Sequence, residues 1–218
     1  VVGQALSTAV DSQADTAVSA AVGLNIALLD STAQVGEGAS LTAGSIAVEA
    51  QTAAGETNTY QSRALAGSVG KSTSVSGSVS INVVEQDTHA LVGEDAELTA
   101  SSGDITVKAE TRSELQNVAG GAALSTQSGG TGVGVAVALN ILDQDTRATL
   151  GADLDETTGA GSTSATASGG VSVTASGSIL PITEELPVIG EVAVTSFAAG
   201  AAASSGNAIG GSSSVHVF

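Results

Sequence analysis

The feature that most constrains this chain is an internal repeat that occurs three times and begins again near the C-terminal end. The copies start at Asn25, Asn82 and Asn140, at almost equal steps along the chain. Each copy has an Asp five residues after the Asn and a Gly eleven residues after it. His216 stands in the equivalent position after Asn140, at the end of a longer third step. A period of this kind predicts an array of units stacked on their neighbours.

We interpret residues 1–218 as a single repeat array, with units at about 5–62, 63–120 and 121–192 and a partial unit at 193–218. Two insertions, at 155–162 and 178–191, account for the extra length of the third step. The chain begins with Val1 rather than Met and has no signal-peptide pattern, so we expect a mature product or a piece of a longer protein.

Composition and alternation favour strands over helices. The chain has 28 Gly, only 1% aromatic residues, and an apolar fraction made mostly of Ala and Val. Segments such as Ser45-Ile46-Ala47-Val48 alternate with a period of two, which marks a strand with one buried face. In residues 74–81 the same alternation predicts a dry face of Val75, Val79 and Ile81 and a wet face of serines.

The fold class that these observations predict is all-β, a right-handed parallel β-solenoid built from ~57-residue repeats. Each unit would hold two or three coils, of about 29 or about 19 residues each, stacked at the ~4.8 Å strand separation. The alternative is an antiparallel all-β repeat array. In that arrangement Val83-Val84 and Ala90-Leu91-Val92 would form hairpin arms around Glu85-Gln86-Asp87.

The charge balance excludes several classes of partner. The formal net charge is −17, from 22 acidic and 5 basic residues, and such a surface repels nucleic acid and anionic lipid. We therefore expect no nucleic-acid partner. No run of about 18 apolar residues is present, so we also expect no membrane insertion. The absence of Cys excludes disulfides and thiolate metal sites.

The landmarks resemble those of a known family. The pattern N-[IV]-x-x-x-D-[ST]-x-A-x-[VL]-G, followed by a G-x-[IV]-x-V-x-A strand, is similar to the repeats of giant bacterial surface adhesins of the filamentous haemagglutinin and leukotoxin-like type. It is carried by Asn25, Asp30, Ala33 and Gly36 and by the equivalent residues of the next two units, although His216 departs from it. The resemblance implies a β-solenoid stalk at the cell surface, used for adhesion or as a spacer.

The Asp and Asn columns are the candidate polar sites. Asp30, Asp87 and Asp145 could bind Ca²⁺, which prefers carboxylate and carbonyl oxygens, or could form turns through their own backbone bonds. We expect no other cofactor. The Asn column is predicted to cap turns or to form a ladder of amide bonds between stacked coils. His89 aligns with Thr32 and Arg147 and is predicted to be an exposed strand residue. The Gly129–Gly134 run has no following Lys and is not a phosphate loop.

The insertion at 178–191 is the main break in the pattern, because it holds both prolines and the densest cluster of large apolar residues. It either folds back on the array or docks onto another chain. The candidate interaction residues are Ile179, Leu180, Pro181, Ile182, Leu186, Pro187, Val188 and Ile189, together with Phe218 at the end of the chain.

These observations predict a structural or adhesive segment of an extracellular bacterial filament or giant surface protein, without catalysis. Its partners would be copies of itself stacked head to tail, or further repeats of the same chain, with a cell-surface or matrix ligand also possible. The alternatives are a calcium-dependent extracellular spacer and a β-helix enzyme that degrades polysaccharides with paired carboxylates.

Overall fold

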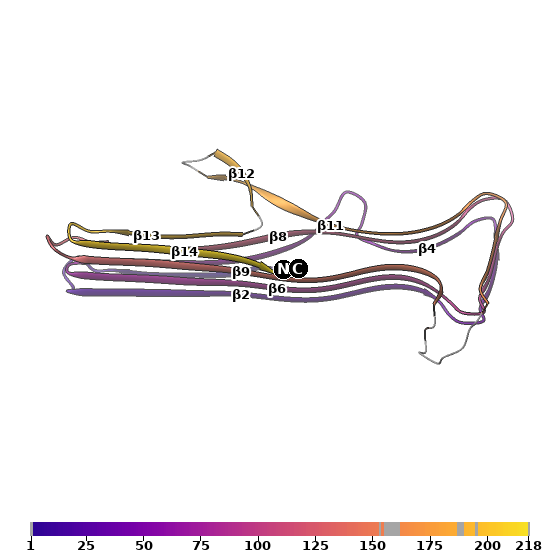
Figure 1. Cartoon of the computed structure of the whole chain (residues 1–218), viewed down its shortest axis with the longest axis horizontal. Helices are drawn as coiled ribbons and strands as arrows, with labels where there is room; N and C mark the ends of the chain where they lie inside the picture. Colours follow the sequence, from indigo (N-terminus) through magenta and orange to yellow (C-terminus); the bar gives the residue numbers. More distant parts are fainter. Residues whose placement is uncertain (1, 153, 155–161, 187–189, 195, 218) are drawn as a thin grey trace.

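The structure, a computed structural model, describes residues 2–152, 154, 162–186, 190–194 and 196–217. These residues form fourteen β-strands and no helix (Figure 1). Sheet I consists of β2 (Thr16–Val35), β6 (Thr73–Gly93), β9 (Thr131–Ala152) and β14 (Asn207–Val217). Sheet II consists of β1 (Val2–Val10), β4 (Ile46–Gln51), β5 (Asn58–Gly70), β8 (Ile105–Ser125), β11 (Val171–Leu186), β12 (Gly190–Val194) and β13 (Ser196–Ala203). The end sheet consists of β3 (Ser40–Ala43), β7 (Glu97–Ala100) and β10 (Ser164–Ala167).

The strands of each repeat pair in parallel with the equivalent strands of the next. The chain runs from β6 in sheet I through β7 in the end sheet to β8 in sheet II, and then enters sheet I again at β9. Thr16 pairs with Thr73, and Thr73 pairs with Thr131, so each strand lies beside the strand one full repeat away. The expected division of each repeat into two or three coils is therefore wrong. The strands are so long that one repeat passes once through the three sheets and forms a single coil.

The antiparallel alternative is also wrong for the repeats. Val84 and Ala90 lie on one uninterrupted strand, β6, which pairs in parallel with β2 on one side and β9 on the other. Glu85-Gln86-Asp87 is therefore strand and not a turn. The antiparallel pair in the described residues is β11 with β12, where Ile182 lies opposite Val194.

In one half of the molecule, sheets I and II face each other directly, and the expected dry and wet faces are exchanged. Ser74, Ser76 and Ser80 of β6 are buried between the sheets, whereas Val75 and its equivalents point outward. The buried hydroxyls are hydrogen-bonded: Ser76 donates to the Ala66 carbonyl at 2.7 Å, and Ser80 donates to Ser62 at 2.9 Å. The interior is therefore narrow and filled by small side chains, in which serine hydroxyls lie beside clusters of buried alanines.

The physical reason is the closeness of the two sheets. A Cβ atom placed on Gly121 of β8 would overlap the carbonyl oxygen of Val135 on β9. The same atom on Gly23 of β2 would lie 2.5 Å from the carbonyl oxygen of Arg63 on β5. Only Gly, Ala, Ser and Asn fill so narrow a space, so the larger Val, Leu and Ile side chains occupy the outer faces.

The other half has a conventional apolar core, because the end sheet holds sheets I and II apart (Figure 1). Val92 of β6, Leu98 of β7 and Ile105 of β8 are fully buried there, one from each sheet. Tyr60 and Leu115 lie in a second cluster with Ala27, Val84 and Leu142. The Tyr60 hydroxyl donates to Gln86 Oε1 at 3.2 Å, and Ser113 donates to the same oxygen at 2.7 Å.

The Asn column forms part of the predicted ladder, but within strands and not at turns. Asn25, Asn82 and Asn140 are buried on β2, β6 and β9, and the register places them side by side. Asn25 Nδ2 donates to Asn82 Oδ1 at 2.8 Å. The register also pairs His216 with Asn140, as the sequence alignment predicts.

The long insertion begins slightly later than the sequence indicates. β11 follows the register of β8 as far as Pro181, which lies opposite Leu115, and β13 resumes it at Ser196 opposite Asn117. The additional residues thus come after Pro181, where β11 and β12 form a pair that extends away from the two long sheets (Figure 1). The other insertion, 155–162, lies outside the described residues except for Ser162.

Candidate functional site

The predicted Asp column forms a row across three strands of sheet I. Asp30 pairs with Asp87, and Asp87 with Asp145, so the three carboxylates lie on neighbouring strands of the same outer face. They stand in the middle of strands, so the prediction that they form turns is wrong. Parallel in-register pairing puts like charges about 4.8 Å apart, which costs energy unless cations or donors compensate.

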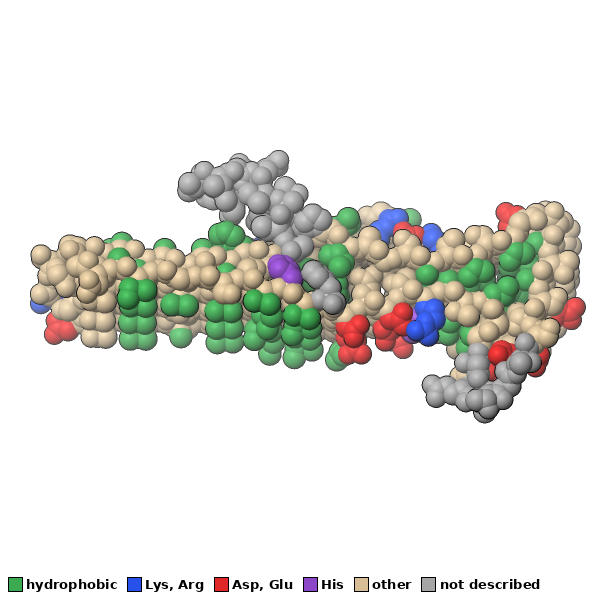
Figure 2. All heavy atoms as spheres, in the orientation of Figure 1, with side chains coloured by type: hydrophobic (Ala, Val, Ile, Leu, Met, Phe, Trp, Pro, Cys, Tyr) green, Lys and Arg blue, Asp and Glu red, His purple; other side chains and the backbone are tan. Residues whose placement is uncertain are grey.

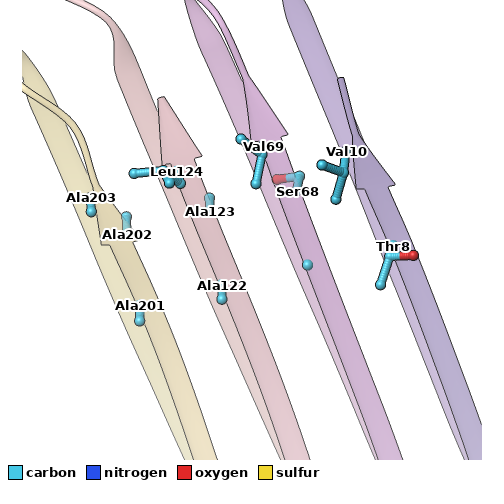
Figure 3. A pocket seen from close by; sticks show the side chains of 11 residues that line it. Thr8, Val10, Ser68, Val69, Ala122, Ala123, Leu124, Ala201, Ala202 and Ala203 are labelled. Atoms are coloured by element: carbon cyan, nitrogen blue, oxygen red, sulfur yellow. The ribbon is translucent and has the colours of Figure 1, made fainter. Parts of the chain in front are cut away.

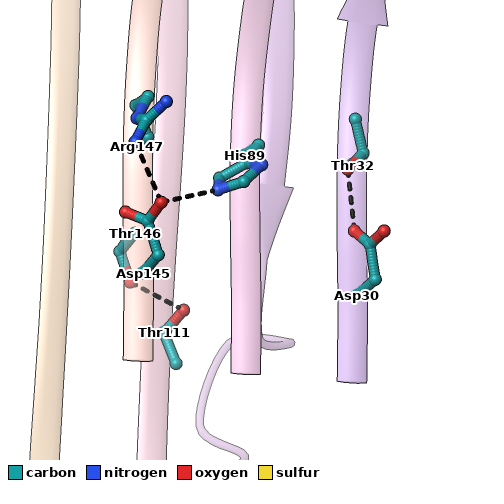
Figure 4. A network of polar contacts seen from close by, with 7 residues as sticks. All are labelled: Asp30, Thr32, His89, Thr111, Asp145, Thr146 and Arg147. Carbon is teal, nitrogen blue, oxygen red and sulfur yellow. Dashed lines mark hydrogen bonds and ion pairs between the residues drawn. The ribbon is translucent and has the colours of Figure 1, made fainter. Parts of the chain in front are cut away.

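Donors from the adjacent row compensate part of this charge. Thr32, His89 and Arg147 form that row, two residues further along the same strands. His89 Nε2 lies 3.2 Å from Asp145 Oδ2, and Arg147 Nη2 donates to the same oxygen at 3.0 Å (Figure 4). The Thr32 hydroxyl donates to Asp30 Oδ1 at 2.8 Å.

One part of this cluster has the ligand types of a cation site. Asp87, His89 and Asp145 each offer one ligand atom, and these atoms lie within 4.8 Å of one another. Two carboxylates and an imidazole suit Zn²⁺ or a similar transition metal, whereas Ca²⁺ requires six to eight oxygens. The Arg147 guanidinium on Asp145 opposes cation binding there. A hydrated divalent cation held by the three groups would compete with Arg147 for Asp145 Oδ2.

The sequence predicts that His89 is a simple exposed strand residue, whereas its side chain is 23% exposed and in contact with Asp145. Its neighbours depend on which strand lies beside β6 and in which register. If each strand is assumed to lie beside the strand one repeat away, the aligned repeats predict these neighbours. The assumption of two or three coils per repeat hides this contact.

The predicted interaction residues of the insertion are only partly described. Ile179 and Leu180 on β11 are each 39% exposed. Pro181 ends the parallel register with β8, and the backbones of Ile182 and Leu186 lie in the β11–β12 pair. Pro187, Val188, Ile189 and Phe218 lie outside the described residues. The docking role of this segment remains a prediction.

A larger feature that sequence reasoning missed is the outer face of sheet I. From Thr16 to Ile26 on β2, and on the strands that continue this register, the outward side chains are uncharged and mostly Val, Leu or Ile. Figure 2 shows them as green columns in the left half of the view, followed by acidic and basic side chains. We call this surface the apolar face. Its large side chains are Val18, Val22, Leu24, Ile26, Val75, Val79, Ile81, Val83, Val133, Val135, Val137, Leu139, Ile141, Ile209, Val215 and Val217.

The outer face of sheet II is apolar too, but it is furrowed. Gly67, Ala122 and Ala201 form a row of small residues, bordered on one side by Val10, Val69 and Leu124. Part of the furrow is a cavity of about 380 Å³ (Figure 3). A neighbouring cavity of about 450 Å³ continues it toward Leu6, Leu65 and Phe197.

No family model, curated protein or solved structure matches this chain. Among the described residues, no helix is long and apolar enough to cross a lipid bilayer.

Proposed function

We propose that this chain is a structural or adhesive segment of an extracellular bacterial filament or giant surface protein, built as a right-handed parallel β-solenoid without catalysis. The observation that carries the proposal is that each strand pairs with the strand one repeat away, so equivalent residues of successive repeats lie side by side. Such an array grows by adding identical layers. Right-handed crossovers are the general rule for parallel strands, and this supports the handedness.

The ends of the stack support association end to end. β2 and β14 are the two edge strands of sheet I, and each presents backbone donors and acceptors on its outer side. The β14 edge has the register of β9, so the β2 edge of another copy or of further repeats can add to it in the same way. Stacking of this kind is heterologous and open, and it generates a filament.

Hydrogen exchange tests the end-to-end stacking. At high protein concentration we expect the amides of β2 and β14 to become protected, while β6 and β9, which have partners on both sides, are protected at every concentration. Concentration-independent exchange of both edge strands would contradict stacking between copies. Protease treatment of intact cells that produce the parent protein, followed by detection of the segment, tests the surface location independently.

A second candidate, the calcium-dependent spacer, is favoured by the Asp30–Asp87–Asp145 row. Cations that bridge these carboxylates would stabilise the folded chain by mass action. The test is thermal melting with Ca²⁺ or a chelator, and separately with Zn²⁺, on the unaltered chain, Asp87→Asn and Asp15→Asn. The control removes one carboxylate at an exposed position away from the row. A melting temperature that does not respond to Ca²⁺ in the unaltered chain would exclude this candidate, and a response to Zn²⁺ alone would assign the row to a transition metal instead.

A further inference from the structure

The apolar face is too extensive to be explained as scattered surface residues. Val22 and Leu24 at its β2 edge are 65% and 53% exposed, and Ile209 at its β14 edge is 58% exposed. The register joins these edges through continuous rows, such as Leu24, Ile81, Leu139 and Val215. Contiguous apolar patches of more than a few hundred Å² on soluble proteins mark interaction surfaces.

From the observed distribution of side chains, we propose that the apolar face is an interface at which a second copy of this chain packs, sheet on sheet. The inference goes beyond the end-to-end stacking proposed above, since it concerns the broad side of the molecule and not its strand edges. Serines, alanines and glycines fill the interior beneath this face. Within the described part of the chain, the large apolar side chains of the face therefore pack only against their neighbours in sheet I.

The size of the face agrees with a dimer. Four strands at about 4.8 Å and ten residue steps at about 3.3 Å give a plane of roughly 600 Å² per copy. Two such faces in contact bury roughly 1,200 Å² in total, which reaches the lower bound for specific and stable interfaces. The face is also uneven: Ala20 and Gly77 leave a hollow between the Val18 and Val22 rows on β2 and β6, whereas Val135 fills the same row on β9. A facing side chain can fit into the hollow.

Charge favours a second copy over an oppositely charged partner. The chain carries a net charge of −17, yet the apolar face has no charged side chain before the row that contains Glu85 and Asp143. A two-fold axis that lies in the plane of the interface, perpendicular to the strands, puts the two acidic rows at opposite ends of the interface. The apolar rows then meet without bringing like charges together.

Sedimentation of the whole chain tests the proposal with the matched variants Val22→Lys and Leu6→Lys. Leu6 on β1 lies on the outer face of sheet II and is 76% exposed, and Val22 on β2 is 65% exposed. Both variants therefore place a Lys at a solvent-exposed position, but on opposite faces of the molecule. We expect a dimer at about 100 µM protein, a hundredfold above a micromolar Kd. Val22→Lys should weaken the dimer at least tenfold, and Leu6→Lys should not.

A second measurement covers the case in which a Lys variant fails to fold. The chain has no Cys, so Ile81→Cys and Leu65→Cys give single thiols near the middle of the apolar face and on the outer face of sheet II. Oxidation should cross-link the first into dimers and leave the second monomeric.

Three outcomes would overturn the proposal. They are a monomeric chain at about 100 µM, well above a micromolar Kd, equal effects of the two Lys variants, and cross-linking at Leu65→Cys alone. Association that survives Val22→Lys and protects the amides of β2 and β14 would support end-to-end stacking and reject this interface. A monomer that instead pellets with neutral lipid vesicles, but not as Val22→Lys, would assign the face to lipid.

Discussion

At the scale of single residues, the narrow half of the molecule depends on side chains that fit between two closely spaced sheets. Ser76 and Ser78 are neighbours on the inner face of β6, and both are buried. Ser76 has a hydrogen bond to the Ala66 carbonyl, whereas Ser78 Oγ finds no partner among the described residues. A buried hydroxyl without a partner costs free energy that the same residue with a partner does not.

We therefore expect opposite effects from the same substitution at these two positions. Ser78→Ala should raise the free energy of unfolding by about 1 kcal/mol, and Ser76→Ala should lower it by about 1 kcal/mol. The register neighbours of Ser78 are Ala21 and Ala136, so Ala fits there. Urea denaturation followed by circular dichroism measures both changes. Equal destabilisation by the two variants would show that the Ser78 hydroxyl has a partner such as ordered water.

Tyr60, the only tyrosine of the chain, gives a direct measure of burial at the junction of the two halves. Burial raises the pKa of its hydroxyl to about 12. Because the folded pKa lies above the unfolded value of about 10, stability is unaffected below pH ~10 and falls as the pH rises from there toward 12. Absorbance of tyrosinate should show the raised pKa. Tyr60→Phe should flatten the stability profile between these pH values, and a tyrosine that titrates near pH 10 in the folded chain would contradict the burial.

Individual residues also show what the sequence could not determine. The alternation of Val75, Val79 and Ile81 with serines identified two faces of a strand, but period two is the same whichever face is inside. Hydrophobicity suggested the wrong choice, because the distance between the sheets, set by glycines on other strands such as Gly121, excludes large side chains. The Asn ladder was predicted from the recurrence of Asn in each repeat, but its direct contact between Asn25 and Asn82 requires a step of one repeat per layer.

At the scale of elements, the strands proved longer than the sequence indicated. β2, β6 and β9 run for 20, 21 and 22 residues through the Asp positions, for which a turn was one of the two predicted roles. Polar residues tolerate a strand position when their side chains point outward, as Asp30 and Asp87 do, so polarity alone did not mark the strand ends. In the structure, Gly38 and Gly129 lie in the turns after β2 and β8 with positive φ, a conformation that Gly adopts readily.

The close approach of β8 to β9 can be tested at a glycine. Gly121→Ala should destabilise the chain by about 1–3 kcal/mol, because its Cβ meets backbone atoms that cannot move independently. The matched control is Gly77→Ala on β6, where the added Cβ has nothing within 4 Å. The control should be neutral or stabilise by up to about 1 kcal/mol, since Gly is unfavourable within a strand. If Gly121→Ala were tolerated as well as Gly77→Ala, the sheets would be further apart than described.

At the scale of the whole molecule, charge and apolar surface act against each other. The net charge of −17 repels copies of the chain, while the strand edges and the apolar face attract them. Parallel stacking was predictable from the constant spacing of the landmarks. The length of the coil was not, because it depends on how many sheets the chain visits before it returns, and periodicity within a strand carries no such information.

Salt should therefore strengthen association. The range of repulsion between copies falls from about 30 Å at 0.01 M ionic strength to about 8 Å at 0.15 M. We expect the weight-average mass from light scattering to rise across this range of NaCl at constant protein concentration. Val22→Lys separates the two modes, since a rise that persists in it belongs to the strand edges. A mass that falls with added salt would show that contacts between opposite charges hold the copies together.

The step of one repeat per layer sets how the chain converts residues into length. Each passage through the three sheets, a whole repeat, advances the stack by only about 4.8 Å, less than about 0.1 Å per residue, whereas an α-helix advances about 1.5 Å per residue. A long tether built this way would be very costly in protein. The arrangement instead makes each layer wide. A tension along the stack is shared by all the backbone hydrogen bonds between neighbouring strands, and β2 and β6 pair over twenty residues. Such a segment is suited to resist mechanical separation of its layers more than to span a long distance.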